Sequence, residues 1–391
     1  MFTKTFVLLI LTNTVLGALF HESSLIQIEP PDDIENMAFG FSIGYQKSGQ
    51  LVIGAPYNDL NGAVYICTIE DIMNDKRVCQ KANIDVEGLT VNSTREDYPD
   101  RHYCLGASIA ATDDYFLTCA PFWKSSYDKI EPGITSSSYG TCFMYNGTAH
   151  LYNGPYEQYI KNKVNRHSFG NGLGWTSLYD QSNNLILLSK IFDRGHLSYI
   201  SSEDPLKPSW STESLTSTAR FQSIANKFRY IGSGLASGKF LYSNTNQTVY
   251  AVSMRTDDTY GKILFLKYKN KKLYLVPRVS VDSEMVNTMF GSAMVGADIN
   301  SDGYTELVVG APAYYEDDAY ETGALYIYTG GDLETIGSRN RTRLIVGNKV
   351  GARFGSAIAS TDVDGDGFPE LIVSAPYEDF GVGAVYIIYG K

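Results

Sequence analysis

Acidic and amide side chains alternate in a short loop near the C-terminal end of the chain, and a glycine follows them. A hard cation such as calcium takes about six to eight oxygen ligands, and alternate side chains on a tightly curled loop can all point inward. Glycine permits the turn, and a backbone carbonyl fills a further position. The predicted calcium ligands of this loop are Asp298, Asn300, Asp302, the carbonyl of Tyr304, and Glu306.

The same pattern occurs again 64 residues later. Acidic, glycine-rich loops are also ordinary solvated turns, but two occurrences at the same place in a repeat favour a cation site. The flanking segments LVVGAP and LIVSAP are strand-like, so the ion would brace a β-hairpin, and its full coordination leaves no open position for a substrate. The predicted ligands of the second loop are Asp362, Asp364, Asp366, the carbonyl of Phe368, and Glu370.

Groups for catalysis or for nucleic-acid binding are not indicated by the sequence. The five histidines lack the spacing of metal ligands, and neither a Gly-x-Ser-x-Gly elbow nor a phosphate-binding loop occurs. A net charge of −11 and a pI near 5.0 disfavour a phosphate backbone as partner. We therefore expect neither an enzyme nor a nucleic-acid binder, and metal cations or basic protein surfaces suit the charge better.

The two loops belong to a longer repeat that must position them. FGSAMVGADINSDGYTELVVGAP, from Phe290, aligns without gaps with FGSAIASTDVDGDGFPELIVSAP, from Phe354. Weaker copies begin near residues 39, 105, 169 and 231, so the period is 59 to 66 residues. Each unit predicts a strand, a turn, a second strand ending in Ala-Pro in most copies, a loop, and a third strand that begins at glycine.

This period, together with 36 glycines and 13% aromatic residues, indicates four-stranded blades rather than helices. A blade cannot bury both faces of its sheet alone, so neighbouring blades supply the core. We predict an all-β β-propeller with six recognisable units over residues 18–391. The third unit lacks the Ala-Pro, and the fourth lacks an acidic loop.

The N-terminus has the pattern of a signal peptide over residues 1–17. Lys4 precedes an apolar run from Phe6 to Leu11, and small residues follow at Gly17 and Ala18. A membrane anchor is the alternative, but the run is too short to span a bilayer. No later segment predicts a transmembrane helix, so we expect a secreted chain that is soluble unless a partner holds it.

Five cysteines in an oxidising compartment predict two disulfides and one remaining thiol. Spacing favours Cys67–Cys79 and Cys119–Cys142, which leaves Cys104; each bridge would stabilise the fold by about 3 kcal/mol. Sequons for N-glycosylation agree with secretion. They lie at Asn92, Asn146, Asn246 and Asn340.

The units, with FG, then DxNxDG or DxDxDG, then GAP or SAP, resemble the FG-GAP repeats of integrin α subunits. LIQIEP followed by FGFSIGYQKSGQLVIGAPYND looks like that family's opening strand and first blade. LTCAP with GTCF looks like its blade-two disulfide, which also pairs Cys119 with Cys142. YIGSGLASG and then VYAVSM look like the blade before the calcium-bearing ones.

The resemblance implies an adhesion function. Family members fold seven blades, pair the propeller with an integrin β subunit, and bind extracellular matrix or cell-surface proteins outside the plasma membrane. No von Willebrand-like domain is inserted between units two and three. Aromatic residues of the FG and Ala-Pro turns are then expected to line a rim that meets a β-subunit cation, with packing between blades as the alternative. These residues are Phe39, Tyr57, Phe122, Phe290, Phe354 and Tyr377.

Three departures from the family pattern qualify this expectation. Six units are visible, and the chain ends at GAVYIIYGK where the family continues into a seventh blade, so we expect a fragment or short isoform unless six blades close. Residues 163–166 and 226–229 are basic where Arg-Gly-Asp readers have acids, which argues against an arginine-reading pocket. Glu306 and Glu370 replace Asp but keep the charge.

Two other functions fit the residues less well. A soluble propeller, secreted as a decoy or an independent binding module, would need no β subunit. An enzyme of the phospholipase type could carry FG-GAP repeats as an accessory, but no catalytic module accompanies them here.

Overall fold

A computed structural model describes the chain in segments, and every element that it describes over its full length is a β-strand. Two compact units divide the chain, and we describe each by itself: unit 1 comprises Met1–Leu11 and Phe20–Ser214, and unit 2 comprises Thr12–Leu19 and Leu215–Lys391. The described residues are 7–10, 25–28, 41–46, 48–58, 61–68, 71, 79–86, 103–112, 114–123, 140–152, 172–180, 182–190, 196–201, 210–214, 228–229, 231–241, 247–256, 260–316, 319–331, 342–362, 366–378 and 384–390.

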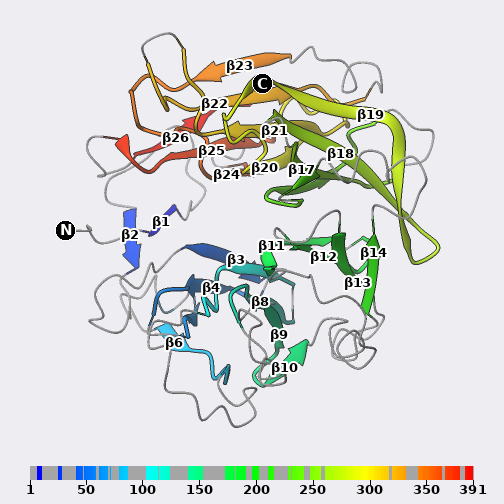
Figure 1. Cartoon of the computed structure of the whole chain (residues 1–391). Helices are drawn as coiled ribbons and strands as arrows, with labels where there is room; N and C mark the ends of the chain where they lie inside the picture. The colour runs from blue at the N-terminus through cyan, green and yellow to red at the C-terminus, as the bar shows by residue number, and fades with distance from the viewer. Residues whose placement is uncertain are drawn as a thin grey trace, which may run out of the picture. The chain divides into compact units, whose positions relative to one another are not determined.

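Unit 1 contains three four-stranded sheets and a two-stranded pair, all antiparallel (Figure 1). The first sheet is β3 (Ser42–Gln46), β4 (Gln50–Ala55), β5 (Ala63–Thr68) and β6 (Cys79–Lys81). The second is β7 (Ser108–Ala111), β8 (Phe116–Ala120), β9 (Thr141–Tyr145) and β10 (Ala149–Tyr152). The third is β11 (Leu173–Asp180), β12 (Leu185–Lys190), β13 (His196–Ser201) and β14 (Trp210–Ser214), and β1 (Val7–Ile10) pairs with β2 (Leu25–Ile28).

Unit 2 continues the series with three more sheets. The first is β15 (Phe228–Arg229), β16 (Leu235–Gly238), β17 (Val249–Thr256), β18 (Tyr260–Lys269) and β19 (Lys272–Val286). The second is β20 (Met294–Ala297), β21 (Glu306–Ala311), β22 (Ala324–Tyr328) and β23 (Arg343–Val346). The third is β24 (Ile358–Thr361), β25 (Glu370–Ala375) and β26 (Ala384–Ile388).

Successive sheets within each unit meet through their first strands, as the blades of a propeller do. In unit 1, β3, β7 and β11 are neighbours; in unit 2, β16 neighbours β20 and β20 neighbours β24. The second strands β4, β8, β21 and β25 end at the Ala of an Ala-Pro, and the third strands other than β18 begin directly after a glycine. The prediction of an all-β propeller of FG-GAP units is therefore confirmed, whereas closure with six or seven blades stays a prediction.

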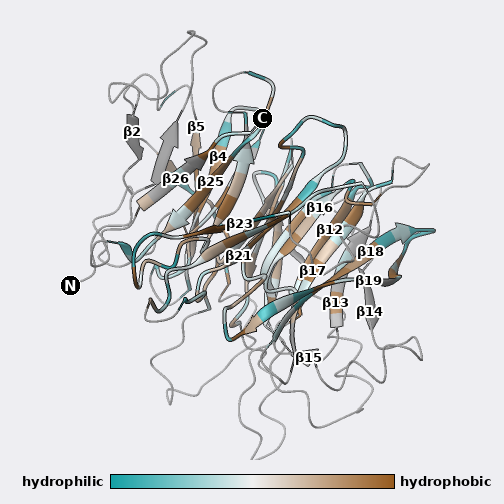
Figure 2. Cartoon of the chain, turned by 90° about the horizontal axis from the view of Figure 1, so that it is seen from above, coloured by the Kyte–Doolittle hydropathy of each residue, from teal (hydrophilic) through white to brown (hydrophobic). Residues whose placement is uncertain are grey.

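Apolar side chains from neighbouring sheets form the core. In unit 2, Val308 and Leu325 pack with Phe354, Leu371 and Val373 of the next sheet. The second strands are buried along nearly their whole length, since neighbouring sheets cover both faces. Figure 2 shows much of β25, the second strand of the last sheet, in the hydrophobic colour. A single blade would leave such a strand exposed.

The repeated glycines mark the points where the backbones of neighbouring sheets approach closely. A Cβ atom at Gly310, in the GAP of the fifth unit, would overlap the carbonyl oxygen of Gly355, in the FG of the sixth. Gly54 approaches Gly106 in the same way in unit 1. The N–H of Gly355 also donates to the carbonyl of Ser374 at 3.0 Å, across its own sheet. Two backbones can lie this close only where side chains are absent.

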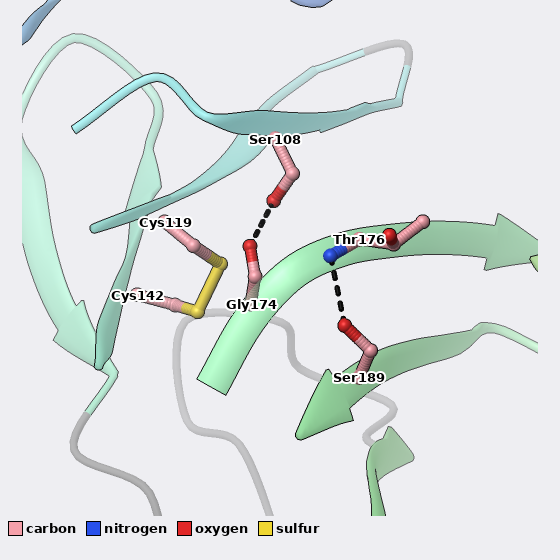
Figure 3. The surroundings of a disulfide bond; sticks show 6 residues. All are labelled: Ser108, Cys119, Cys142, Gly174, Thr176 and Ser189. Atoms are coloured by element: carbon pink, nitrogen blue, oxygen red, sulfur yellow. Dashed lines mark hydrogen bonds between the residues drawn. A yellow bond between two sulfur atoms is a disulfide. The ribbon is translucent and has the colours of Figure 1, made fainter. Parts of the chain in front are cut away.

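The second sheet of unit 1 replaces this glycine with a cysteine. Cys119 of β8 faces Cys142 of β9, and the two form a disulfide with Cα atoms 4.0 Å apart. Gly174 packs against the bridge, where a Cβ atom would overlap Cys119 (Figure 3). The Ser108 hydroxyl donates to the Gly174 carbonyl at 2.6 Å, so the bridge lies at the junction with the next sheet.

The second disulfide joins Cys67 of β5 to Cys79 of β6, so both predicted pairings are present in the structure. Cys104 is buried, and burial raises the pKa of its thiol to about 11. A thiol with so high a pKa is nearly all protonated at neutral pH, so Cys104 is chemically inert there.

Several sequence predictions fall on parts that the structure leaves undescribed. Of the predicted signal peptide, residues 7–10 form β1, and the rest lies outside the described residues; the peptide stays a prediction. The unit starts near 39 and 169 and the sequons Asn92, Asn246 and Asn340 also lie outside. Asn146 is exposed in the turn between β9 and β10. In the described part, no helix is long and apolar enough to cross a membrane.

Two glycines with similar backbone angles allow the close packing to be tested. Gly323 and Gly351 have φ angles of +81° and +75°, but a Cβ atom at Gly323 would overlap the Phe354 carbonyl, whereas one at Gly351 meets nothing within 4 Å. We expect Gly351→Ala to lower the free energy of unfolding by about 1 kcal/mol, from backbone strain alone. Gly323→Ala should cost about 3 kcal/mol or more. Chemical denaturation measures both, and equal losses would contradict the role of close approach.

Candidate metal-binding loops

The loop between β20 and β21 turns its alternate side chains toward its own backbone. The Asp298 carboxylate accepts the N–H groups of Asp302, at 3.0 Å, and Gly303, at 2.9 Å. Asn300 accepts the same Asp302 N–H through its side-chain oxygen at 3.0 Å, and Asp302 accepts the N–H of Tyr304 at 2.8 Å. Three side chains with oxygen acceptors therefore face the interior of one tight loop.

The loop between β24 and β25 repeats this geometry where it is described. Asp362 accepts the N–H of Gly367 at 3.0 Å, and Asp366 accepts the N–H of Phe368 at 2.8 Å. Asp364 lies outside the described residues. The Ser301 hydroxyl donates to the Gly367 carbonyl at 3.2 Å, so the two loops are direct neighbours.

The two glutamates of the pattern are the first residues of β21 and β25, and both are buried. The Glu306 carboxylate accepts the N–H groups of Ile299, at 2.9 Å, and Gly330, at 3.2 Å. Burial raises the pKa of Glu306, and these two hydrogen bonds partly oppose the shift. In this arrangement Glu306 joins the loop to the end of β22. Its predicted part in calcium binding stays a prediction.

The described residues fit a calcium ion by the chemistry of their donors. Each carboxylate oxygen has more than one lone pair, so Asp298 and Asp302 can bind a cation while keeping their N–H bonds. Asn300 and the Tyr304 carbonyl would add two further oxygens. Within the described part of the chain, no three or more His, Cys, Asp or Glu residues gather as a metal cluster, so a cation in this loop would need amide and backbone oxygens as well.

Two of the aromatic residues expected on a partner-binding rim lie in the core instead. Phe290 is buried and packs edge-on against Tyr326, with ring centroids 5.1 Å apart. Phe354 is buried against Tyr386 in the same manner, at 5.3 Å. Both therefore pack between sheets, the alternative that the sequence left open, and neither is accessible to a partner in this structure.

The other described residues of that set are more accessible. Tyr57 is 48% exposed and lies edge-on to Phe41, and Phe122 is half-buried against Trp175 at 5.8 Å. Tyr377 is 55% exposed, and the Arg353 guanidinium lies over its ring, 4.8 Å from the centroid. Phe39 lies outside the described residues.

Sequence reasoning missed Arg353, which also binds the Glu321 carboxylate at 2.7 Å. Both residues lie close to a motif, Arg353 directly before the FG of the sixth unit and Glu321 two residues before the Gly323 that precedes β22. Their positions beside the motifs could be seen in the sequence, but only the fold shows that the two segments meet.

The FG-GAP repeat family matches residues 290–328 and 354–388, which contain the two acidic loops and their flanking strands. The chain's homologues are integrin α subunits. Integrin alpha-4 of Xenopus laevis is 24% identical over 379 residues, which cover 90% of this chain and 34% of that protein. Integrin alpha-6 of Homo sapiens is 32% identical over 164 residues, 41% of this chain and 14% of that protein.

Integrin alpha-PS5 of Drosophila melanogaster is 31% identical over 179 residues, 43% of this chain and 16% of that protein. The chain thus spans at most about a third of the length of these relatives. Among solved structures, the Pseudomonas aeruginosa periplasmic gluconolactonase PpgL shares 10% identity at a TM-score of 0.44, over 78% of this chain and 70% of that one. That likeness is too weak to indicate an activity.

The two loops predict a defined calcium response. Calcium at about 1 mM should raise the Tm, with each filled site adding about 1 kcal/mol to the free energy of unfolding. Asp298→Ala should remove one bound ion and Asp362→Ala the other, measured by calorimetric titration after chelation. Glu284→Gln removes an exposed acid outside the loops and serves as the control. An unchanged Tm in the parent chain, or unchanged stoichiometry in both Ala variants, would contradict calcium binding.

Proposed function

We propose that this chain acts in cell adhesion as an integrin α-like head that pairs with an integrin β subunit and holds calcium in its two acidic loops. The observation that carries the proposal is the similarity to Integrin alpha-4 over 90% of the chain, combined with FG-GAP sheets that meet through their first strands. The matrix or cell-surface ligand would be read jointly with the β subunit.

An exposed surface of unit 2 supports a protein partner. Tyr320 is 67% exposed in the loop after the GAP of the fifth unit, and its carbonyl accepts the N–H of Gly351 at 3.0 Å. That bond brings Tyr320 beside the loop of Val350 and Arg353, which in turn contacts Tyr377. We call Tyr320, Val350, Arg353 and Tyr377 the aromatic surface. Tyrosine and arginine are the residues enriched at protein interfaces.

Calcium would act on this surface indirectly. The acidic loop precedes β21 and the Tyr320 loop follows it, so the two lie at opposite ends of a six-residue strand, about 20 Å long. A cation at one end cannot touch a partner at the other. It would instead hold the turn from β20 to β21 rigid and so fix the strand that carries the Tyr320 loop.

An extracellular location follows from the same features. Two disulfides form in an oxidising compartment, and the exposed sequon at Asn146 is open to glycosylation. We place the protein in the secretory pathway and, with its partner, on the outer face of the plasma membrane. Its role is binding rather than catalysis.

Co-expression tests the partner directly. Residues 18–391 secreted from cells with each of a panel of integrin β-subunit heads should retain one of them on affinity purification in calcium. Tyr320→Ala with Tyr377→Ala should reduce the retained β head at least ~10-fold, because exposed aromatic anchors carry interface energy. Tyr274→Ala removes an exposed ring from a different hairpin and should have no effect.

The opposite result has a clear meaning. If the chain is secreted as a stable monomer that retains no β head and does not respond to calcium, the independent secreted module replaces the adhesion head as its function.

A further inference from the structure

The β18–β19 hairpin concentrates positive charge in an acidic chain. Six of the 32 Lys and Arg residues fall within residues 262–278, and no Asp or Glu lies among them. The chain as a whole has a net charge of −11. The net charge of this segment is therefore positive, whereas that of the whole chain is negative.

Strand register places the charges at the tip of the hairpin on one face. Lys267 pairs with Tyr274, and Lys269 pairs directly with Lys272, across a two-residue turn. Because side chains alternate between the faces of a strand, these four residues point the same way. Lys269 and Lys272 are exposed and Tyr274 is 49% exposed, whereas Leu273 on the opposite face is 7% exposed. We call Lys267, Lys269, Lys272 and Tyr274 the basic face.

A break in the ladder separates the tip from the rest of the sheet. The register shifts between Leu264 and Leu266, where the opposing strand carries extra residues around Pro277. Such a bulge bends the strands and re-aims the side chains beyond it. Below the break, Ile263, Phe265 and Val281 are buried in the core of unit 2. Figure 2 shows the end of β18 beyond the core in the hydrophilic colour.

The basic face is costly for the isolated chain. Like charges directly opposite one another destabilise a strand pair. At the base of the hairpin Lys262 is neutralised by Asp282 at 2.5 Å, but within the described residues no carboxylate pairs with Lys267, Lys269 or Lys272. Because no carboxylate of the described residues neutralises these lysines, an anion from outside the chain can do so.

We propose that the basic face binds a sulfated polysaccharide. The Cβ atoms that carry its lysine side chains are spaced about 7 Å along a strand and about 5 Å across the pair, so the ammonium groups can reach the closely repeated anionic groups of a polymer. Lysines bind such groups as point charges and need no fixed geometry. Tyr274, opposite Lys267, adds a flat exposed ring against which a sugar can pack.

The cellular location of the protein favours one class of polyanion over the others. The two disulfides favour an oxidising, extracellular location, where sulfated polysaccharides are abundant and anionic lipids, which gather in the cytoplasmic leaflet, are scarce. The proposal shares this location with the adhesion function but requires neither a β subunit nor calcium. The two can therefore fail separately.

The test measures binding of the full chain to immobilised heparin in chelator. We expect salt-dependent retention, no retention on fully desulfated heparin, and a lower affinity for the double variant Lys269→Gln/Lys272→Gln. Each lost contact releases about one fewer counterion, so the slope of log K against log salt should fall by about two. At physiological salt the affinity should fall roughly 30-fold.

Controls separate this site from general charge and from misfolding. Lys81→Gln/Lys239→Gln removes two exposed lysines elsewhere in the chain and should leave the slope unchanged. The Lys269→Gln/Lys272→Gln variant should melt at or above the parent Tm, since it removes a repulsion. Equal elution of the two double variants, equal retention on desulfated heparin, or binding to anionic phospholipid vesicles or RNA without binding to heparin would overturn the proposal.

Discussion

The close approach of two backbones at glycine is the constraint on which the sheets depend. Where the GAP glycine of one unit meets the FG glycine of the next, no side chain separates the sheets, and Gly310 with Gly355 is the clearest case. Gly355 also donates its N–H to the Ser374 carbonyl of its own sheet. The same glycine therefore fixes the position of the first strand in its sheet and the distance to the preceding sheet. The two motifs therefore hold neighbouring sheets together.

Once these contacts are fixed, the loops divide into two sets. In the last two sheets the connections from first to second strands carry the two acidic loops, whereas connections from second to third strands carry exposed rings such as Tyr57 and Tyr320. Substitutions in either set leave the glycine contacts untouched. In unit 1 one of these contacts differs, because a disulfide takes the place of a glycine. The Cys119–Cys142 bridge there packs against Gly174 of the next sheet. The two sets of loops can thus vary independently of each other.

The sequence predicted what is local and repeated. Most second and third strands could be located because Ala-Pro or glycine marks one end. Both disulfides were predicted from cysteine spacing, and the structure places each pair face to face on adjacent strands. In the loop between β20 and β21 the alternating side chains accept hydrogen bonds from the loop's own backbone, and their part in calcium binding stays a prediction. Each of these features depends on residues close together in the chain.

Features that depend on distant segments were not predictable. Phe290 and Phe354 belong to turns in sequence but to the core in space, because the neighbouring sheet covers them. The Glu306 carboxylate also accepts the N–H of Gly330, which lies 24 residues away, a contact that the loop pattern does not indicate. The basic face needs the register of β18 against β19, which decides whether alternate lysines converge or separate.

The order of the strands has a consequence for how the protein is made. Within each blade most consecutive strands pair with their neighbours in sequence, whereas the contact between Gly310 and Gly355 closes over 45 residues. Local pairings form faster than distant ones. A chain emerging from the ribosome can therefore complete one sheet before the next is synthesised. The GAP glycine of each finished sheet is then in place to receive the FG glycine of the next unit. Synthesis and assembly can then proceed in the same direction.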